Sequence, residues 1–386
     1  MQITTKQTLA TQASLLLGLM SMSHLVNDAA TSLLTPLLPT LSTTYNVSIG
    51  QTAILVSILA FVGAMLQPIG SIIGDRVERR WLAAGGPLLA LLGMSLIGWA
   101  SSFLVVGICI AVAGIGSALF HPAGVSLVAD HTARARRGLA TALFSAGGTL
   151  GLALGPLWAT NVPMRMFGYA LPVVTAFSLV VFWLTPPTRR AVGPRPGLGD
   201  YARLLRGPIL TLWGMSVLRS VSTVAYTSLV GFMLVERGFP THIGSSLAMF
   251  SAASAVGGII GGRISDRIGR VVVLRSSLVS TVPLFIGLAY ARPDQWWYYP
   301  LIALVGALVN ANIPVTVVTA QEYAPNHVAT ASALMMGFSW GTAGVLFLVV
   351  GKLADYTSPT TALVASIMLL LPAFWLVARL PEPRRD

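Results

Sequence analysis

Gly262-Arg263-Ile264-Ser265-Asp266-Arg267-Ile268-Gly269-Arg270 is a short basic stretch between two long apolar runs. An imperfect second copy lies earlier in the chain, at Ser71-Ile72-Ile73-Gly74-Asp75-Arg76-Val77-Glu78-Arg79-Arg80. Asp75 and Asp266 are 191 residues apart, which is close to half of the 386-residue chain. This spacing predicts two similar halves, each with one charged turn at the same place.

The composition around these turns is that of a membrane protein. Hydrophobic residues make up 55% of the chain and charged residues only 9%, whereas a soluble domain carries roughly 25% charged residues. Apolar runs of about 20 residues, each able to cross a bilayer core of about 30 Å, recur along the chain. We therefore expect an all-α membrane protein with twelve spans, at residues 12–38, 49–73, 81–100, 103–129, 138–160, 165–185, 208–234, 243–265, 271–291, 297–320, 328–350 and 358–380.

The net charge of +12 is explained by Lys and Arg residues in the segments expected on the cytoplasmic side of the membrane. With both termini in the cytoplasm, 19 of the 24 Lys and Arg residues fall in cytoplasmic segments and four in outer segments. This positive-inside bias accounts for the charge without a nucleic-acid partner. The stretch from 185 to 207 is rich in proline and arginine, and it predicts a cytoplasmic linker at 186–207 between halves 1–185 and 208–386. A short amphipathic helix is expected near 198–205.

Six plus six helices with a charged turn after the second helix of each half resemble the major facilitator superfamily. Its turn signature, Gly-x-x-x-Asp-Arg-x-Gly-Arg-Lys/Arg, is matched at nine positions by residues 262–270, and Val271 replaces the tenth. The copy at 71–80 keeps Asp75 and Arg76 but has Ser71 and Glu78 where the signature has glycines. The resemblance covers the whole chain and implies two pseudo-symmetric six-helix bundles.

A narrower resemblance is to the fosmidomycin-resistance type of transporter within that superfamily. It rests on His24-Leu25-Val26-Asn27-Asp28 in the first helix and Leu119-Phe120-His121-Pro122 in the fourth. Val317-Val318-Thr319-Ala320-Gln321-Glu322 and Gly351-Lys352-Leu353-Ala354-Asp355 are similar to the same family's tenth and eleventh helices. This resemblance implies efflux of a small compound and identifies no substrate.

Few charges fall inside the apolar runs, and each is costly there, by roughly 2.5–3.5 kcal/mol on insertion scales. His24 and Asp28 are spaced i, i+4, so they share one face of the first helix. An imidazole beside a carboxylate is a candidate proton-carrying pair. The alternative is a polar pair that orients the helix against its neighbours by hydrogen bonds.

Arg219 is singled out by the repeat, because adding the 191-residue offset to Asp28 reaches it. The resemblance implies that the first and seventh helices line one central cavity, so the two charges would face each other there. Arg219 would then hold an anionic substrate group, or pair with Asp28 when no substrate is present. A static ion pair is the alternative.

The fourth and tenth helices also correspond. His121 and Pro122 are offset by 192 residues from Ile313 and Pro314, and both prolines free backbone carbonyls within their helices. His121 is a second candidate proton or substrate group, against a hydrogen-bonded structural histidine. Three amides are candidates for substrate contact, namely Asn27, Asn310 and Asn312, and two acidic residues, Asp130 and Glu322, are expected at helix ends at the same offset.

The charged turns are expected to act as conformational latches. The latch residues are Asp75, Arg76, Gly262, Asp266, Arg267 and Arg270. An acidic residue there would sit at a helix N-terminus across the boundary between the halves, where backbone N–H groups favour it. The alternative is a solvated turn that only sets topology.

The fifth helix contains Gly151, Gly155 and Pro156, which are similar to the Gly-Pro signature of antiporters in the superfamily. The later glycines of that signature are absent, and the arginine that drug antiporters carry in the fourth helix is Ile110 here. Any proton relay therefore falls to His24, Asp28 and His121.

The leading hypothesis is a proton-coupled antiporter that exports a small polar or anionic compound by alternating access. The alternatives are a symporter or facilitator that imports a small organic anion, and a non-transporting membrane receptor. No enzyme activity, cofactor or metal site is expected. The partners are a small-molecule substrate, protons and the lipid bilayer, and the protein is expected to work as a monomer in a bacterial cytoplasmic (inner) membrane.

Overall fold

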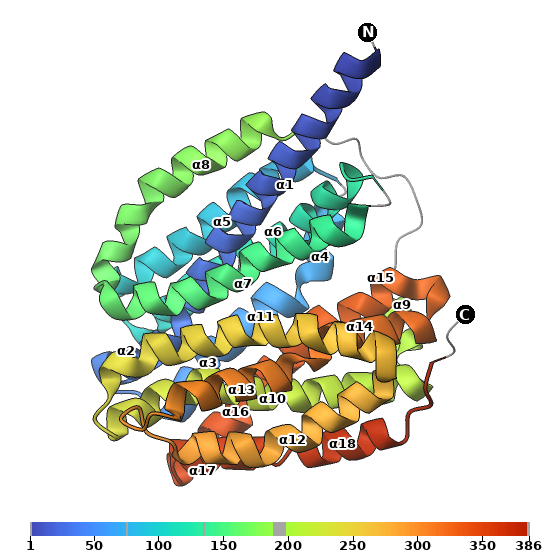
Figure 1. Ribbon diagram of the computed structural model, residues 1–386. Helices are drawn as coiled ribbons and strands as arrows, with labels where there is room; N and C mark the ends of the chain where they lie inside the picture. Colours follow the sequence, from blue (N-terminus) through green and yellow to red (C-terminus); the bar gives the residue numbers. More distant parts are fainter. Residues whose placement is uncertain (1, 75, 134–135, 188–197, 384–386) are drawn as a thin grey trace. The chain divides into compact units, whose positions relative to one another are not determined.

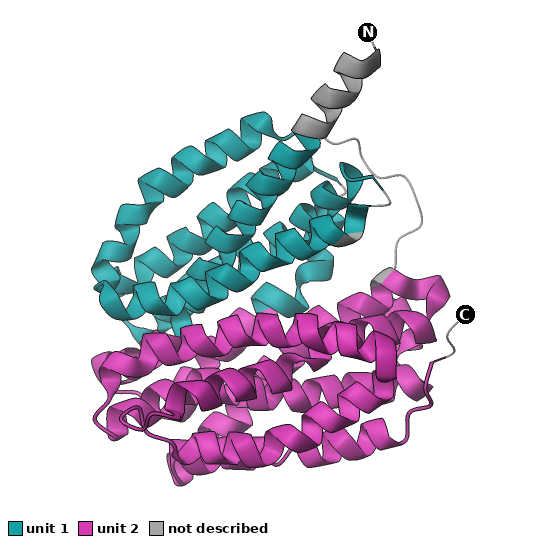
Figure 2. Ribbon diagram, in the orientation of Figure 1, with its two compact units in different colours: residues 1–34, 62–192 teal, residues 35–61, 193–386 magenta. Residues whose placement is uncertain are grey.

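The computed structural model describes residues 2–74, 76–133, 136–187 and 198–383, and all of its regular elements are helices (Figure 1). The chain forms two compact units, residues 1–34 with 62–192 and residues 35–61 with 193–386 (Figure 2). Residues 35–61 thus pack with the second unit, although they precede most of the first in sequence. The predicted halves, 1–185 and 208–386, describe how the sequence repeats, and they stay a prediction.

In unit 1 two long helix pairs lie side by side, α1 along α7 and α5 along α6, and α8 packs on α5 (Figure 1). The helices are α1 (Gln2–Ser32), α4 (Gln67–Gly74), α5 (Arg79–Leu96), α6 (Phe103–Asp130), α7 (Arg137–Asn161) and α8 (Leu171–Leu184). Short 3₁₀ turns at Ile97–Trp99 and Met164–Ala170 lead out of α5 and into α8. The apolar core between these helices includes Phe120 and Phe144.

In unit 2 α10 is buried along most of its length, and α16, α17 and α18 pack on it. In the same unit α3 packs along α16, and α11 packs along α13. The helices are α2 (Leu34–Tyr45), α3 (Ile49–Ala60), α9 (Leu198–Leu204), α10 (Gly207–Glu236), α11 (Ile243–Ile268), α12 (Arg270–Tyr290), α13 (Tyr298–Asn310), α14 (Asn312–Tyr323), α15 (Val328–Ala333), α16 (Ser339–Tyr356), α17 (Pro359–Ile367) and α18 (Leu370–Ala378).

Helix breaks lie a few residues before prolines. The breaks after Ser32, at Ala311 and after Ile367 precede Pro36, Pro314 and Pro372, and a π-helical segment at Phe61–Met65 precedes Pro68. A proline ring removes one backbone hydrogen bond and crowds the carbonyl four residues earlier, which explains these positions. Of the two prolines predicted to free backbone carbonyls within their helices, Pro314 follows a break at Ala311, whereas α6 continues through Pro122.

Eleven helical segments of the described chain are long and apolar enough to cross a membrane. Their bounds follow eleven of the twelve predicted spans within a few residues. The remaining predicted span, 12–38, corresponds to α1, which is long enough but carries His24, Asn27 and Asp28 and ends at Ser32. These polar side chains lower its hydropathy, so α1 is the least lipid-like of the predicted spans. The short helix predicted within the linker corresponds to α9.

Candidate functional site

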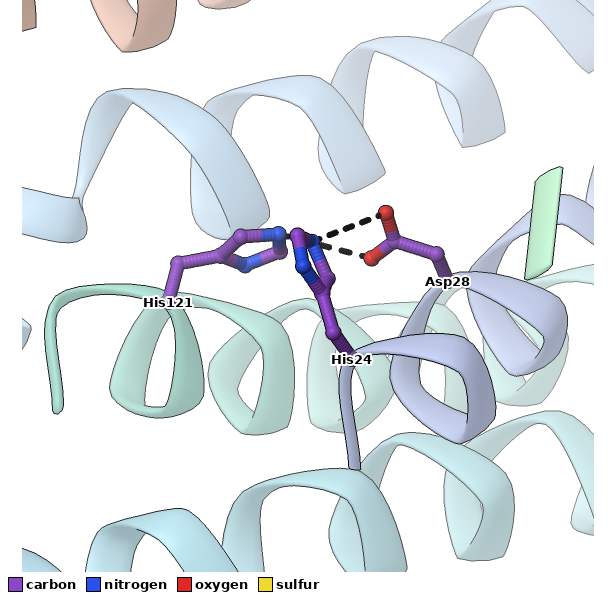
Figure 3. Close-up of side chains that lie close together, drawn as sticks. All are labelled: His24, Asp28 and His121. Atoms are coloured by element: carbon purple, nitrogen blue, oxygen red, sulfur yellow. Dashed lines mark ion pairs between the residues drawn. The ribbon is translucent and has the colours of Figure 1, made fainter. Parts of the chain in front are cut away.

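The central feature of unit 1 is a carboxylate that two neighbouring imidazoles face (Figure 3). His24 and Asp28 lie one turn apart on α1, and the distance from His24 Nε2 to Asp28 Oδ2 is 3.3 Å. His121 reaches the same carboxylate from α6, with Nε2 3.4 Å from Oδ1. His24 is 8% exposed and Asp28 is 9% exposed, so bulk water screens neither charge effectively. The structure thus brings together the three residues that the sequence singled out for proton transfer.

Both imidazoles are held by backbone carbonyl groups on their far side. His24 Nδ1 lies 2.9 Å from the carbonyl oxygen of Phe144, and His121 Nδ1 lies 2.9 Å from that of Ser117. A carbonyl oxygen only accepts hydrogen bonds, so each Nδ1 carries a proton and donates it. In a neutral imidazole the other nitrogen, Nε2, then has a lone pair and no proton. When both imidazoles are neutral, both Nε2 atoms therefore point a lone pair at Asp28.

Asn27 supports the carboxylate from the same helix. Its Nδ2 donates to Asp28 Oδ1 at 2.9 Å and lies 3.3 Å from Ser117 Oγ. Its Oδ1 is buried and has no hydrogen-bond partner. Asn27 was predicted to contact substrate, and that role stays a prediction. The observed role of its side chain is to orient Asp28.

Glycines on α7 make room for the cluster. A methyl group added at Gly148 would collide with the His24 ring, and one at Gly151 would come within 3.1 Å of Asp28 Cβ. One at Gly155 would meet the backbone and side chain of α1 around Ala29 and Ser32. The glycines that resemble an antiporter signature thus allow α1 and α7 to approach closely. The ring of Phe144 stacks on His24, with centroids 4.3 Å apart.

Unit 2 holds a buried arginine. Arg219 on α10 is 1% exposed, and its Nη1 donates to Asn310 Oδ1 at 3.0 Å and its Nη2 to Ser220 Oγ at 2.9 Å. The guanidinium carbon lies 5.9 Å from the ring centre of Trp340, within cation–π range. Asn310 is held in turn by Ser254, whose Oγ accepts from Nδ2 at 2.7 Å.

The guanidinium has unused hydrogen-bonding capacity. Its Nε is buried with no hydrogen-bond partner, and no carboxylate in the described part of unit 2 forms an ion pair with Arg219. The structure therefore joins Arg219 to Asn310, one of the amides predicted to contact substrate, but not to Asn312. Asn312 Oδ1 accepts from Ser277 at 2.6 Å instead, because the break at Ala311 separates the two asparagines. Asp28 and Arg219 lie in separately described units, so their pairing stays a prediction.

Sequence reasoning missed several supporting residues. Ser117 is one turn before His121, and Ser220 follows Arg219 directly, so a search for polar neighbours at i−4 and i+1 finds them. Ser254 and Trp340 come from distant segments and have no local signal. The carbonyl of Phe144 is invisible in any sequence, because every residue has one.

The charged turns carry equivalent ion pairs in the two units. Arg79 Nη1 lies 2.6 Å from Asp130 Oδ2 in unit 1, and Arg270 Nη2 lies 3.2 Å from Glu322 Oε1 in unit 2. The members of the two pairs differ by 191 and 192 residues, which is the offset of the sequence repeat. Asp130 and Glu322 are therefore partners of the turn arginines, as well as helix-end charges.

The latch residues themselves are only partly described. Asp266 is 2.5 Å from Arg270 Nη1, and Arg76 and Arg267 are exposed. Asp75 lies outside the described residues. A methyl group added at Gly262 would make only an ordinary contact with Pro314, at 4.0 Å, whereas one at the neighbouring Gly261 would collide with Ala311. The latch role of this set stays a prediction.

A model of the Major Facilitator Superfamily matches residues 20–348. The chain belongs to the Major Facilitator Superfamily. It is thus a multi-pass integral membrane protein that moves a small-molecule substrate across a lipid bilayer, and it is a transporter and not an enzyme. The predicted fold, two bundles of the major facilitator type, agrees with this membership.

Known members of the superfamily resemble the chain over most of its length. The fosmidomycin resistance protein of Escherichia coli is 29% identical over 96% of this chain and 93% of its own. A probable nitrate/nitrite transporter of Mycobacterium tuberculosis is 27% identical over 70% of this chain and 71% of its own. The crystal structure of the nucleoside transporter NupG matches 94% of this chain and 99% of its own with a TM-score of 0.78. Its 14% identity means that this last match shows the fold alone.

Membership in the Major Facilitator Superfamily gives the buried charges their context. A transporter of this fold carries polar groups in its spans at a cost, and such groups mark ion and substrate pathways. The cluster on α1 and α6 and the arginine on α10 are the two such groups described above. They are two candidate functional sites, one in each unit.

Proposed function

We propose that the protein is a proton-coupled secondary active transporter that exports a small polar or anionic compound, drugs included, in exchange for protons. The single observation that carries this proposal is the cluster of His24, Asp28 and His121. The likeness to a fosmidomycin resistance protein supports export. The cluster and Arg219 have separate roles in the proposal.

The cluster favours proton uptake because its lone pairs oppose one another. With both Nδ1 protons donated to carbonyls, the two neutral imidazoles and the carboxylate present only acceptors to each other. One added proton turns one His–Asp contact into a hydrogen bond, and a second does the same for the other contact. The net charge of the cluster then rises from −1 to 0 and to +1. A site that binds one or two protons away from bulk water suits a coupled transporter.

Arg219 is the proposed anion-binding group. Its unpartnered Nε and its fixed position between Asn310 and Ser220 favour an acceptor oxygen of a substrate. Asn310 and Asn27 stay candidate substrate contacts, and Asn312 is a weaker one because it is bonded to Ser277.

Coupling would follow from competition for the same charges. We propose that Asp28 and Arg219 neutralise each other when the substrate site is empty, and that protonation of Asp28 frees the arginine for an anion. The halves 1–185 and 208–386 would then rock about the site, with the linker 186–207 between them. The latch residues of the charged turns would stabilise the outward-open state. The protein would act as a monomer in the inner membrane of a bacterium, with both termini in the cytoplasm.

A symporter or facilitator that imports a small anion is the second candidate. The similarity to a probable nitrate/nitrite transporter favours it, as does the buried arginine. The two candidates differ in the direction of proton movement, so one experiment separates them.

The test is transport in everted membrane vesicles with an imposed pH gradient, with fosmidomycin as the first probe. Antiport predicts that substrate addition releases protons from wild-type vesicles and that Asp28→Asn abolishes the release while the protein is still inserted. Arg219→Gln should abolish uptake of anionic probes. Proton entry together with substrate would support the symporter instead, and coupling that is unchanged in Asp28→Asn would refute the role of the cluster.

A further inference from the structure

Three ligand atoms of metal-binding type converge from two helices. The Nε2 atoms of His24 and His121 and a carboxylate oxygen of Asp28 all lie within 4.8 Å of one another (Figure 3). In a tetrahedral site with metal–ligand distances of about 2.0–2.1 Å, neighbouring ligand atoms are about 3.3 Å apart. The distance from His24 Nε2 to Asp28 Oδ2 is 3.3 Å and that from His121 Nε2 to Asp28 Oδ1 is 3.4 Å, so each imidazole lies at about this distance from one of the two carboxylate oxygens.

The groups behind the three ligands are those expected of a metal site. A histidine that binds a metal through one nitrogen nearly always donates its other N–H to a carbonyl or carboxylate. His24 and His121 do so through Phe144 and Ser117 at 2.9 Å each. Asn27 holds the carboxylate at 2.9 Å, as a partner in the outer shell of a metal site would. A simple packing contact would require neither this orientation of the two imidazoles nor the hydrogen bond that supports the carboxylate.

We propose that His24, Asp28 and His121 bind a divalent first-row transition-metal ion such as Zn²⁺. Two imidazole nitrogens and one carboxylate suit Zn²⁺, Co²⁺ and Ni²⁺, whereas Mg²⁺ and Ca²⁺ require mostly oxygen ligands. Three protein ligands leave a fourth position for water or a substrate group. The sequence predicted no metal site, because α1 and α6 are far apart in the chain and the set includes no cysteine.

A divalent ion and two protons have the same effect on the net charge of the cluster, and this comparison does not depend on transport. The cluster with neutral imidazoles and an ionised carboxylate has a net charge of −1, and a divalent ion raises it to +1. Two added protons give the same +1. The ion therefore replaces two protons on the same three side chains, and the buried site has the same net charge in both states. Metal binding is measured without a gradient or a substrate, so its failure and that of the transport proposal are separate results.

The experiment uses the full chain, without a polyhistidine tag, in lipid nanodiscs. Co²⁺ is titrated while its ligand-field absorption is recorded, and Zn²⁺ is then added as a competitor. We expect one Co²⁺ per chain with a tetrahedral spectrum, and displacement by Zn²⁺. His24→Gln and His121→Gln should each lower the affinity at least about 100-fold, and Asn27→Ala about 10–100-fold as an outer-shell change.

His131→Gln is the matched control. His131 also donates Nδ1 to a carbonyl four residues earlier, that of Leu127, but it is not one of the three convergent ligands. This variant should bind Co²⁺ like the wild type. The proposal is overturned if wild-type protein binds neither ion, or if the His24→Gln and His121→Gln variants bind as tightly as the wild type. If these variants do not fold, the wild-type spectrum decides, because an octahedral water-like spectrum also overturns the proposal.

Discussion

Gly148 on α7 packs against the ring of His24, and its lack of a side chain leaves room for that ring beside Asp28. A methyl group there would overlap the ring atoms of His24. We expect Gly148→Ala to destabilise the protein by about 1–3 kcal/mol, typical of overpacking, or to turn His24 away from Asp28. Thermal unfolding measures the loss of stability, and substrate-induced proton release measures the displacement of His24. At least one of these two quantities should decrease in Gly148→Ala.

The control for this change is Gly85→Ala on α5. A methyl group at Gly85 meets no atom within 4 Å, and alanine favours a helix over glycine by about 1 kcal/mol. Gly85→Ala should therefore leave proton release unchanged and raise the unfolding temperature slightly. If Gly148→Ala behaves like Gly85→Ala in both measurements, the close approach of α7 to His24 is not needed for the site.

At this scale the sequence predicted some of the contacts between polar residues and missed others. The i, i+4 spacing placed His24 and Asp28 on one face of a helix, and the structure confirms their contact. The repeat offset could not show that Phe144 and Ser117 carbonyls hold the imidazoles, because backbone groups have no sequence signature. It also treated Asn310 and Asn312 alike, although the break at Ala311 separates their side chains.

Among the elements, α3 and α16 are joined at one end by a carboxylate. Asp355, in the last turn of α16, accepts from Ser48 Oγ at 2.8 Å and from the backbone N–H of Gly50 at 2.9 Å. Ser48 is the N-cap of α3, so Asp355 sits at the positive end of that helix. We call this contact the α3–α16 clasp. Sequence patterns located both helices but not the clasp, because its partners are about 300 residues apart.

Removing the clasp should loosen the start of α3. Loss of a capping contact costs about 0.5–2 kcal/mol, so Asp355→Ala should open this end of α3 more often. A cysteine at Thr52, which is 1% exposed, reports the opening when Cys109 is first replaced by alanine. Labelling by a maleimide should become about 2- to 30-fold faster in Asp355→Ala, which is that energy range expressed as a rate ratio.

Lys352→Ala is the control for the clasp. The Lys352 ammonium lies 4.0 Å from Asp355 and is largely exposed, so its loss should have little effect. Equal labelling of Thr52→Cys in the Asp355→Ala protein and in its parent would show that the clasp does not hold α3.

At the scale of the whole molecule, the repeat organises the charges as well as the helices. The same type of ion pair joins a turn arginine to a helix-end acid in each unit, Arg79 with Asp130 and Arg270 with Glu322. Sequence comparison of the two halves predicted the positions of these residues but not that they pair. The buried charges break the symmetry of the repeat, because the sequence offset relates Asp28 in one unit to Arg219 in the other. The ion pairs at the charged turns have the same signs in both halves, whereas the charges with a proposed function, on Asp28 and Arg219, have opposite signs.

The distribution of basic residues leads to a last prediction, the orientation of the whole chain. Nineteen Lys and Arg residues fall in segments expected inside and four in segments expected outside, and loops rich in these residues stay in the cytoplasm. The turn around Asp294 should therefore face outward and the turn around Asn326 inward. Both residues are exposed in unit 2, and they lie at opposite ends of the α13–α14 span. In a Cys109→Ala background, Asp294→Cys should react with an impermeant maleimide in intact cells, and Asn326→Cys only after permeabilisation. The reverse pattern would place both termini outside and would invert the proposed direction of transport.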